Sequence, residues 1–291
     1  MTKSIKDDIL KAIREVPLIS PSASQLLEIS NDPDHGLVDL VNIVKHDAPL
    51  TAQLLRIVNS AAFSRRAEIT SIDRALSLLG EDMVVGMVLA DAASHLFDSS
   101  LEGYGGAKGD LWEHNLRSAV AAKKIAAYSK TRVNGDTSFT CGLLHDLGKA
   151  IISDYLKNTP AEIIPAIAQG KFNNYSAAEQ EILGLDHAEV GLELARYWQL
   201  PEPLPSVIGY HHKPDQAPSE IKPLAYVVHL GDIIAMLSGG GTGSDNLFHG
   251  LVPEYVDYID LNNDDLALVV IEVNEEFNRI RNSLGREGVE Q

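Results

Sequence analysis

The sequence predicts an all-α fold made of two helical lobes. Apolar residues recur three or four positions apart in one segment after another, which is the spacing of a single helix face. Ser, Asp, Pro and Gly stand at the ends of these segments, where they favour helix starts and stops. Residues 1–100 show none of the two-residue alternation that is typical of half-buried strands.

The composition indicates a globular protein with an acidic surface. The chain has 291 residues, of which 45% are hydrophobic, so it can fill a sizeable core. Its 24 basic and 41 acidic residues give a net charge of −17, which would repel a nucleic acid. The longest uncharged apolar run, Met83 to Ala90, falls far short of the roughly 20 residues of a membrane helix. Because residues 1–8 also lack a signal-peptide pattern, we expect a cytoplasmic protein with no direct nucleic-acid or membrane contact.

Residues 1–105 are expected to form the first lobe. Ile5, Ile9 and Ile13 mark an amphipathic helix over about residues 4–16, and Ser20-Pro21 opens the next one. Further helices are expected at residues 37–45, 49–60, 72–79 and 82–97. Histidines and carboxylates do not cluster in this part of the sequence, so we expect no reaction centre there.

Residues 106–237 are expected to form the second lobe, because four glycines between Leu101 and Gly109 break helices. Its helices are expected at residues 110–128, 136–156, 176–183, 187–198, 203–210 and 224–236. Ser176 to Glu179 and Asp186 to Glu189 both have the form of a capping box. Residues 238–291 complete the chain, with a flexible glycine-rich linker from Ser238 to Asn246 and a C-terminal amphipathic helix from Leu261 to Leu284.

The stretch from Cys141 to Ile152 is a buried-helix pattern that His145, Asp146 and Lys149 interrupt. An ionised carboxylate in such a pattern is costly to desolvate unless a cation or several hydrogen-bond donors meet it. Lys149 lies three residues after Asp146 and could form a helical ion pair with it, whereas a metal ion is the other candidate. The stretch alone leaves both readings open. Cys141, the single cysteine, is expected to be a core residue.

Other polar residues of the second lobe favour the metal. Five histidines and three aspartates lie beside helix caps or within apolar helices: His114, His145, His187, His211, His212, Asp110, Asp146 and Asp232. Imidazole and carboxylate without thiolate favour iron, manganese, cobalt or zinc, bound as one ion or two. The alternative is that each is a separate surface or capping residue. His229 is expected at most to orient Asp232 or a neighbouring helix.

The order of these motifs resembles the HD superfamily of metal-dependent phosphohydrolases. After His114, the remaining candidates lie in LLHDLGK, DHAEVG, GYHHKP and HLGD. Within the superfamily the chain is similar to the HDOD family, whose first-lobe motifs resemble residues 47–55, 58–63 and 72–80. The resemblance covers about residues 10–237. It implies an all-helical N-terminal lobe packed on an HD-like lobe, and a role in bacterial signalling, often without demonstrated catalysis.

The resemblance also implies roles for individual residues. The superfamily's basic metal-binding set is matched by His114, His145, Asp146 and Asp232. The additional ligands of two-metal relatives such as the HD-GYP family are matched by His187, His211 and His212. Lys149 matches a lysine that helps to hold the substrate phosphate, and Asp110 stands where some HD-GYP members have a bridging glutamate.

The chain departs from the HD-GYP pattern after the paired histidines, because residues 213–218 contain no Gly-Tyr-Pro. Cyclic dinucleotide hydrolysis is therefore not supported. We expect a regulatory protein that acts through contacts with a protein partner in signalling. The alternative is a metal-dependent phosphohydrolase that acts on a nucleotide or phosphoester. In that enzyme Asp146 and Lys149 would be catalytic, and one or two ions of iron, manganese or zinc would be the cofactor.

Overall fold

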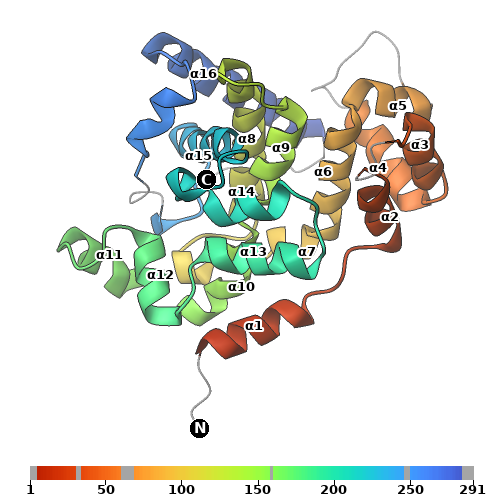
Figure 1. Cartoon of the computed structure of the whole chain (residues 1–291). Helices are drawn as coiled ribbons and strands as arrows, with labels where there is room; N and C mark the ends of the chain where they lie inside the picture. The colour runs from red at the N-terminus through yellow and green to blue at the C-terminus, as the bar shows by residue number, and fades with distance from the viewer. Residues whose placement is uncertain (1–4, 31–33, 60–68, 158–159, 246–249, 284–291) are drawn as a thin grey trace.

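The computed structural model describes residues 5–30, 34–59, 69–157, 160–245 and 250–283. In these ranges the regular elements are α-helices and short 3-10 helices, and the β contacts are the isolated bridges Leu101↔Gly106 and Ser129↔Ile259. The all-α prediction is confirmed (Figure 1). Ser60 to Phe63, the end of a first-lobe motif, and Leu284, the expected end of the last helix, lie outside the described residues.

The N-terminal helices follow the predicted apolar stripes. They are α1 (Ile5–Glu15), α2 (Pro21–Ser30), α3 (Leu37–Lys45), α4 (Ala48–Val58), α5 (Ile72–Leu79), α6 (Glu81–Ala92) and α7 (Ser94–Phe97). The single helix expected over residues 82–97 is interrupted at Ala93, between α6 and α7. Contacts among α2 to α6 gather these helices on one side of the molecule (Figure 1).

Helix α1 packs away from this group, although the sequence prediction placed it in the first lobe. It contacts α10 and α13, and its apolar stripe buries Ile9 and Ile13. The Tyr197 hydroxyl donates to the Arg14 carbonyl at 3.1 Å, and the Trp198 indole donates to the Pro17 carbonyl at 3.1 Å. The sequence did not indicate this packing, because an amphipathic stripe specifies that a helix is buried on one face without specifying its partner. The division near residue 105 stays a prediction.

The later helices surround a central helix. They are α8 (Asp110–Ile125), α9 (Gly135–Leu144), α10 (Leu147–Ile152), α11 (Pro160–Ala168), α12 (Tyr175–Leu183), α13 (His187–Tyr197), α14 (Leu204–Tyr210), α15 (Lys222–Leu237) and α16 (Asn263–Ser283). Helix α8 packs between α9, α15 and α16, and α13 packs on α10 and α14.

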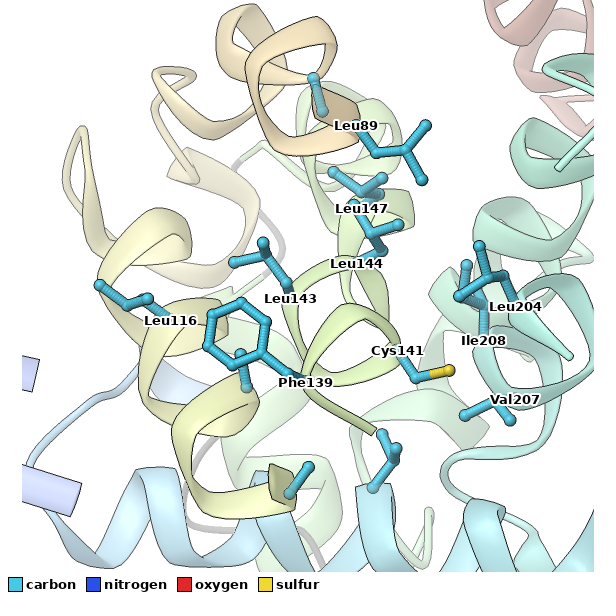
Figure 2. Packing of buried hydrophobic residues seen from close by; sticks show 14 of the residues in the cluster. Leu89, Leu116, Phe139, Cys141, Leu143, Leu144, Leu147, Leu204, Val207 and Ile208 are labelled. Atoms are coloured by element: carbon cyan, nitrogen blue, oxygen red, sulfur yellow. The ribbon is translucent and has the colours of Figure 1, made fainter. Parts of the chain in front are cut away.

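Helix α9 is buried on all sides. Its residues from 138 to 144 are all buried, and α6, α8, α14 and α15 contact it. Figure 2 shows Phe139, Cys141 and Leu143 on this helix, with Leu116 of α8 and Val207 of α14 around them. A helix that is apolar on every face belongs in a protein interior. The C-terminus of α9 therefore delivers His145 and Asp146 into the interior of the molecule.

The glycine-rich segment after α15 is packed against the helices. The sequence predicted a flexible linker from Ser238 to Asn246, yet Ser238, Thr242 and Asp245 are buried. That prediction was wrong for residues 238–245, and Asn246 lies outside the described residues. Glycines permit the close backbone approach that this packing needs, so the same composition serves a packed segment as well as a linker. The described helices include none that is long and apolar enough to cross a membrane.

Candidate metal centre

The interruption of the buried-helix pattern is a break between two helices. His145 caps the C-terminus of α9, and Asp146 occupies the N-cap position of α10. Gly148 allows α10 to approach α13, because a Cβ at that position would overlap the His187 carbonyl oxygen. The break and this close approach bring Asp146 and His187 to the same point in the interior.

The Asp146 carboxylate stands between four imidazoles. Its Oδ1 lies 3.4 Å from His187 Nε2 and 3.5 Å from His211 Nε2. Its Oδ2 lies 3.4 Å from both His114 Nε2 and His145 Nε2. Two atoms that each bind one ion at about 2 Å lie roughly 3 Å apart, so these separations suit shared coordination.

Two potential ligand groups share Asp146. One consists of His114, His145 and Asp146, and the other of Asp146, His187, His211 and His212. Within each group, one ligand atom per residue lies within 4.8 Å of the others. Asp232 joins the first group at 3.1 Å from His114 Nε2 and 3.8 Å from His145 Nε2. All seven residues predicted as metal ligands therefore come together, and their role as ligands stays a prediction.

Backbone carbonyls orient three of the imidazoles. The Nδ1 atoms of His114, His145 and His211 each lie close to a carbonyl oxygen: 3.0 Å from Gly240, 2.8 Å from Gly142 and 2.7 Å from Ile208, respectively. A carbonyl oxygen only accepts, so each Nδ1 carries its proton and donates it. Each Nε2 then faces Asp146. Metal-binding histidines are commonly fixed in this way by a hydrogen bond from the second ring nitrogen.

The residues present fit a metal ion. Asp146 Oδ1, His211 Nε2 and Asp232 Oδ2 are buried and make no hydrogen bond of acceptable geometry among the described residues. Leaving such atoms without a partner costs free energy that coordination would recover. The donors are imidazole nitrogens and carboxylate oxygens, a set that suits iron, manganese or zinc. The structure thus contains a buried His/Asp cluster that could hold a divalent metal.

The histidines compensate the buried carboxylates through protonation. Burial lowers the pKa of His114, but hydrogen bonds with Asp146 and Asp232 outweigh burial and raise it to about 10. Burial likewise lowers the pKa of His187, and Glu179 raises it to about 9. In the metal-free protein, protons on these rings therefore supply part of the positive charge that a metal would supply.

The pKa values of Asp146, Asp232 and His211 are all lowered, which keeps the carboxylates ionised and the imidazole neutral. Burial raises the pKa values of Asp146 and Asp232, yet their basic neighbours, including His145, hold both well below the usual range. Burial lowers the pKa of His211 to about 4. At neutral pH the cluster therefore contains two ionised carboxylates and at least one neutral imidazole, which are the protonation states that metal binding requires.

Lys149 forms the ion pair that one reading of the sequence stretch predicted, and the metal reading stays a prediction. Its ammonium lies 2.7 Å from Asp146 Oδ2, as the helical ion-pair reading predicted, while Asp146 also faces the histidines. Lys149 Nζ also donates to Asp245 Oδ2 at 2.6 Å and to the Thr242 hydroxyl at 3.0 Å. Burial lowers its pKa, and the two carboxylates more than offset this, so the pKa is raised and Lys149 is a cation.

The sequence interpretation of Glu179 was wrong. Helix α12 begins at Tyr175 after an Asn174 cap, so Ser176 to Glu179 is not a capping box. The buried Glu179 carboxylate instead accepts from the His187 ring Nδ1 at 2.7 Å, the His187 backbone N–H at 2.8 Å and the Tyr104 hydroxyl at 2.7 Å. A signal was available, because Glu179 stands four residues after the buried Tyr175 and four before the buried Leu183, on an apolar stripe.

Four further residues that the sequence analysis named lie beside the cluster or apart from it. His229 donates from Nδ1 to the His211 carbonyl, at the end of α14, at 2.8 Å and accepts from the Val252 backbone N–H at 3.0 Å, and its role in orienting a neighbouring helix stays a prediction. Asp110, the first residue of α8, accepts from the Ala107 backbone N–H at 2.7 Å, in the segment before the helix. The capping box at Asp186 and Glu189 is present and places His187 in the first turn of α13.

The chain matches the family description "HDOD domain" over residues 16–214. An HDOD domain protein with unknown function from Geobacter sulfurreducens is 25% identical, with a TM-score of 0.67 over 98% of this chain and 99% of that one. A Shewanella amazonensis SB2B protein, provisionally named a phosphohydrolase, is 23% identical, with a TM-score of 0.66 over 95% and 97% of the two chains. The second of these likenesses carries the fold alone.

An uncharacterized protein of Treponema pallidum is 24% identical over 251 residues, which are 86% of this chain and 48% of the relative. Ribonuclease Y of Mycoplasmoides gallisepticum is 28% identical over 99 residues, which are 34% of this chain and 14% of that protein. The chain therefore spans about half the length of the first of these curated relatives, and its match to the second is shorter still.

Proposed function

The chain belongs to the HDOD family, and from this premise we propose that it is a regulatory protein that binds one or two divalent metal ions and acts through contacts with a protein partner. The observation that carries the proposal is the burial of the metal centre. The side chains of His114, Asp146 and Asp232 are at most 3% exposed, and the most exposed side chain of the cluster, His212, reaches 8%.

A buried metal centre supports a structural role for the ion. The predicted ligands come from α8, the α9–α10 junction, α13, the end of α14 and α15. Two ions at this point would together join five parts of the fold, and their binding free energy would add to folding stability. The metal would thereby hold the surface in the shape that a partner recognises.

The ligands for this ion would be His114, His145, Asp146 and Asp232, with His187, His211 and His212 for a second ion. The net charge of −17 adds to the argument, since an acidic surface slows the approach of an anionic substrate but not of a protein with basic groups.

A metal-dependent phosphohydrolase is the second candidate, and a specific observation favours it. Asp146 contributes one oxygen to each of two imidazole groups, an arrangement suited to two ions that share a carboxylate. When bound, the metal would polarise a phosphoryl oxygen and acidify water. Lys149 would offset negative charge on the phosphoryl group, and the substrate would be a nucleotide or another phosphoester.

One experiment separates the two candidates. The chain is reconstituted with iron, manganese or zinc, and metal content, thermal stability and turnover of a panel of nucleotides and phosphodiesters are measured. The regulatory proposal expects bound metal, a raised melting temperature and no turnover, together with a protein that is retained by the metal-loaded chain and not by Asp146→Ala. Asp154→Ala is the matched control, because Asp154 is an exposed carboxylate just after α10.

Turnover of about 1 s⁻¹ or more that Asp146→Ala abolishes would put the phosphohydrolase first, since such rates lie in the usual enzyme range. A reconstituted chain that binds neither iron, manganese nor zinc would remove both candidates.

A further inference from the structure

The segment from Gly240 to Asp245 lies against the candidate metal centre at two points. The Gly240 carbonyl accepts from His114 Nδ1 at 3.0 Å, and Asp245 Oδ2 accepts from Lys149 Nζ at 2.6 Å. Thr242 and Asp245 are fully buried, and the Thr242 hydroxyl donates to the Asp245 carboxylate at 3.0 Å. We call residues 240–245 the strap.

The strap takes most of the hydrogen-bonding capacity of Lys149. An ammonium group has three donors. Its three short contacts are with Asp146 Oδ2 at 2.7 Å, Asp245 Oδ2 at 2.6 Å and Thr242 Oγ1 at 3.0 Å, and the last two belong to the strap. An anion that approached the metal centre would therefore find Lys149 already engaged. Withdrawal of the strap would free two donors and leave the ion pair with Asp146 intact.

The chemistry of these contacts matches that of a phosphoryl group. The Asp245 carboxylate accepts hydrogen bonds from the Lys149 ammonium and the Thr242 hydroxyl. Ammonium and hydroxyl groups are also donors that bind phosphate oxygens. Asp146 and Asp245 also share the single positive charge of Lys149. The contact of Asp245 is therefore stabilised less than an ion pair with a lysine of its own would be. A dianionic ligand could therefore compete with Asp245 for Lys149.

On this basis, and resting on the metal site of the proposed function, we propose that the strap is an internal competitor at an anion-binding position beside the metal centre. The Asp245 carboxylate occupies the place at Lys149 that a phosphoryl group of a ligand takes when the strap withdraws. The strap thus keeps the site closed, and a phosphoryl ligand and the strap exclude one another.

The structure also identifies what holds the strap in place. The Ser244 hydroxyl donates to the Tyr104 carbonyl at 2.9 Å. Gly243 has a φ of +128°, and a Cβ there would overlap the same carbonyl oxygen. A Gly243→Ala substitution should therefore displace the strap without altering any charge, whereas Asp245→Asn removes the competing charge and leaves the backbone unchanged.

The test measures binding of inorganic phosphate by calorimetry to the full chain, with and without manganese. Asp245→Asn should bind phosphate roughly tenfold more tightly than the wild type or more, because phosphate then displaces a neutral amide from Lys149 and not a carboxylate. Gly243→Ala should shift affinity in the same direction. Adding Lys149→Gln to Asp245→Asn should remove the gain. Asp257→Asn, which removes an exposed carboxylate, is the matched control and should bind as the wild type does.

Folded Asp245→Asn and Gly243→Ala proteins that bind phosphate no better than Asp257→Asn would overturn the proposal. A second measurement needs no variant: high phosphate concentrations should speed amide hydrogen exchange at residues 240–245 of the wild type, and unchanged exchange would also overturn it. Loss of manganese binding in every form counts against the proposed metal site alone, because the phosphate titration without manganese still decides the role of the strap.

Discussion

The two ends of the molecule use their charged residues in different ways. Among the described residues, every buried polar or charged side chain comes from residue 114 or later. In α2 to α6 the buried side chains are apolar, and charged pairs such as Lys45–Asp73 lie at the surface. From α8 onward, by contrast, three aspartates, a glutamate, a lysine and several histidines are enclosed together: Asp146, Asp232, Asp245, Glu179, Lys149, His114, His145, His187 and His211.

This difference distinguishes a region that apolar packing stabilises from a region that also depends on paired buried charges. Apolar burial stabilises the N-terminal helices without any requirement for exact partners. Enclosed charges cost free energy unless every one is compensated, so the second region depends on particular atoms at particular distances. Substitutions in the two regions should therefore differ in which property they change, stability or metal binding, as well as in the size of the change.

Asp146→Ala should have the largest effect. It removes the carboxylate that faces four imidazoles and Lys149, and breaking a buried ion pair costs about 3–5 kcal/mol. We expect a large loss of unfolding free energy in urea and loss of metal binding by elemental analysis. Asp73→Ala is the control from the N-terminal region, and its exposed pair with Lys45 should leave both readings unchanged. Equal losses of unfolding free energy and metal binding in Asp146→Ala and Asp73→Ala would contradict the proposed difference between the two regions.

Leu54→Ala should destabilise the N-terminal region without touching the metal centre. Leu54 is fully buried on α4, and such truncations cost about 2–5 kcal/mol. The variant should therefore unfold at lower urea concentration than the wild type while retaining the same metal stoichiometry. Val38→Ala, on the exposed face of α3, serves for comparison and should change little. A metal content that falls with Leu54→Ala would show that the two regions are not separable.

Glu179→Gln should weaken metal binding more than it weakens the fold. The substitution removes the charge that accepts from His187 Nδ1 and keeps the size of the side chain. Loss of a carboxylate behind a metal-binding histidine typically lowers metal affinity about 10–100-fold. Competition with a chromogenic chelator measures this affinity. Glu181→Gln, two positions on and exposed, is the matched control, and affinity equal to that control would argue that Glu179 does not position His187.

Asn134→Ala should have the smallest effect. Its side chain caps α9 by accepting from the backbone N–H groups of Asp136 and Thr137, at 2.8 and 3.3 Å. Loss of such a cap costs about 1 kcal/mol. Because the candidate metal centre lies at the opposite end of α9, metal affinity should stay at the wild-type value while the urea midpoint falls slightly. Reduced metal affinity would mean that the cap at the start of α9 also affects the position of His145 and Asp146 at its C-terminus.

The sequence by itself determined the helices and the presence of an unusual polar set. Helix spacing, the Asp186 cap and the interruption at His145 and Asp146 are local properties, because backbone hydrogen bonds and caps join residues only a few positions apart. The order of the histidine and aspartate motifs also identified the seven residues that come together.

Only the tertiary structure decided which distant groups meet these residues. Tyr104 and Glu179 are 75 positions apart, and Lys149 and Asp245 are 96 apart, so no local pattern could pair them. The same limit explains why the sequence indicated neither the packing partners of α1 nor the burial of residues in the segment 238–245. An apolar stripe or a run of glycines indicates which structures a segment can adopt. The partner of the segment depends on packing across the whole fold, in which each buried charge needs a compensating group.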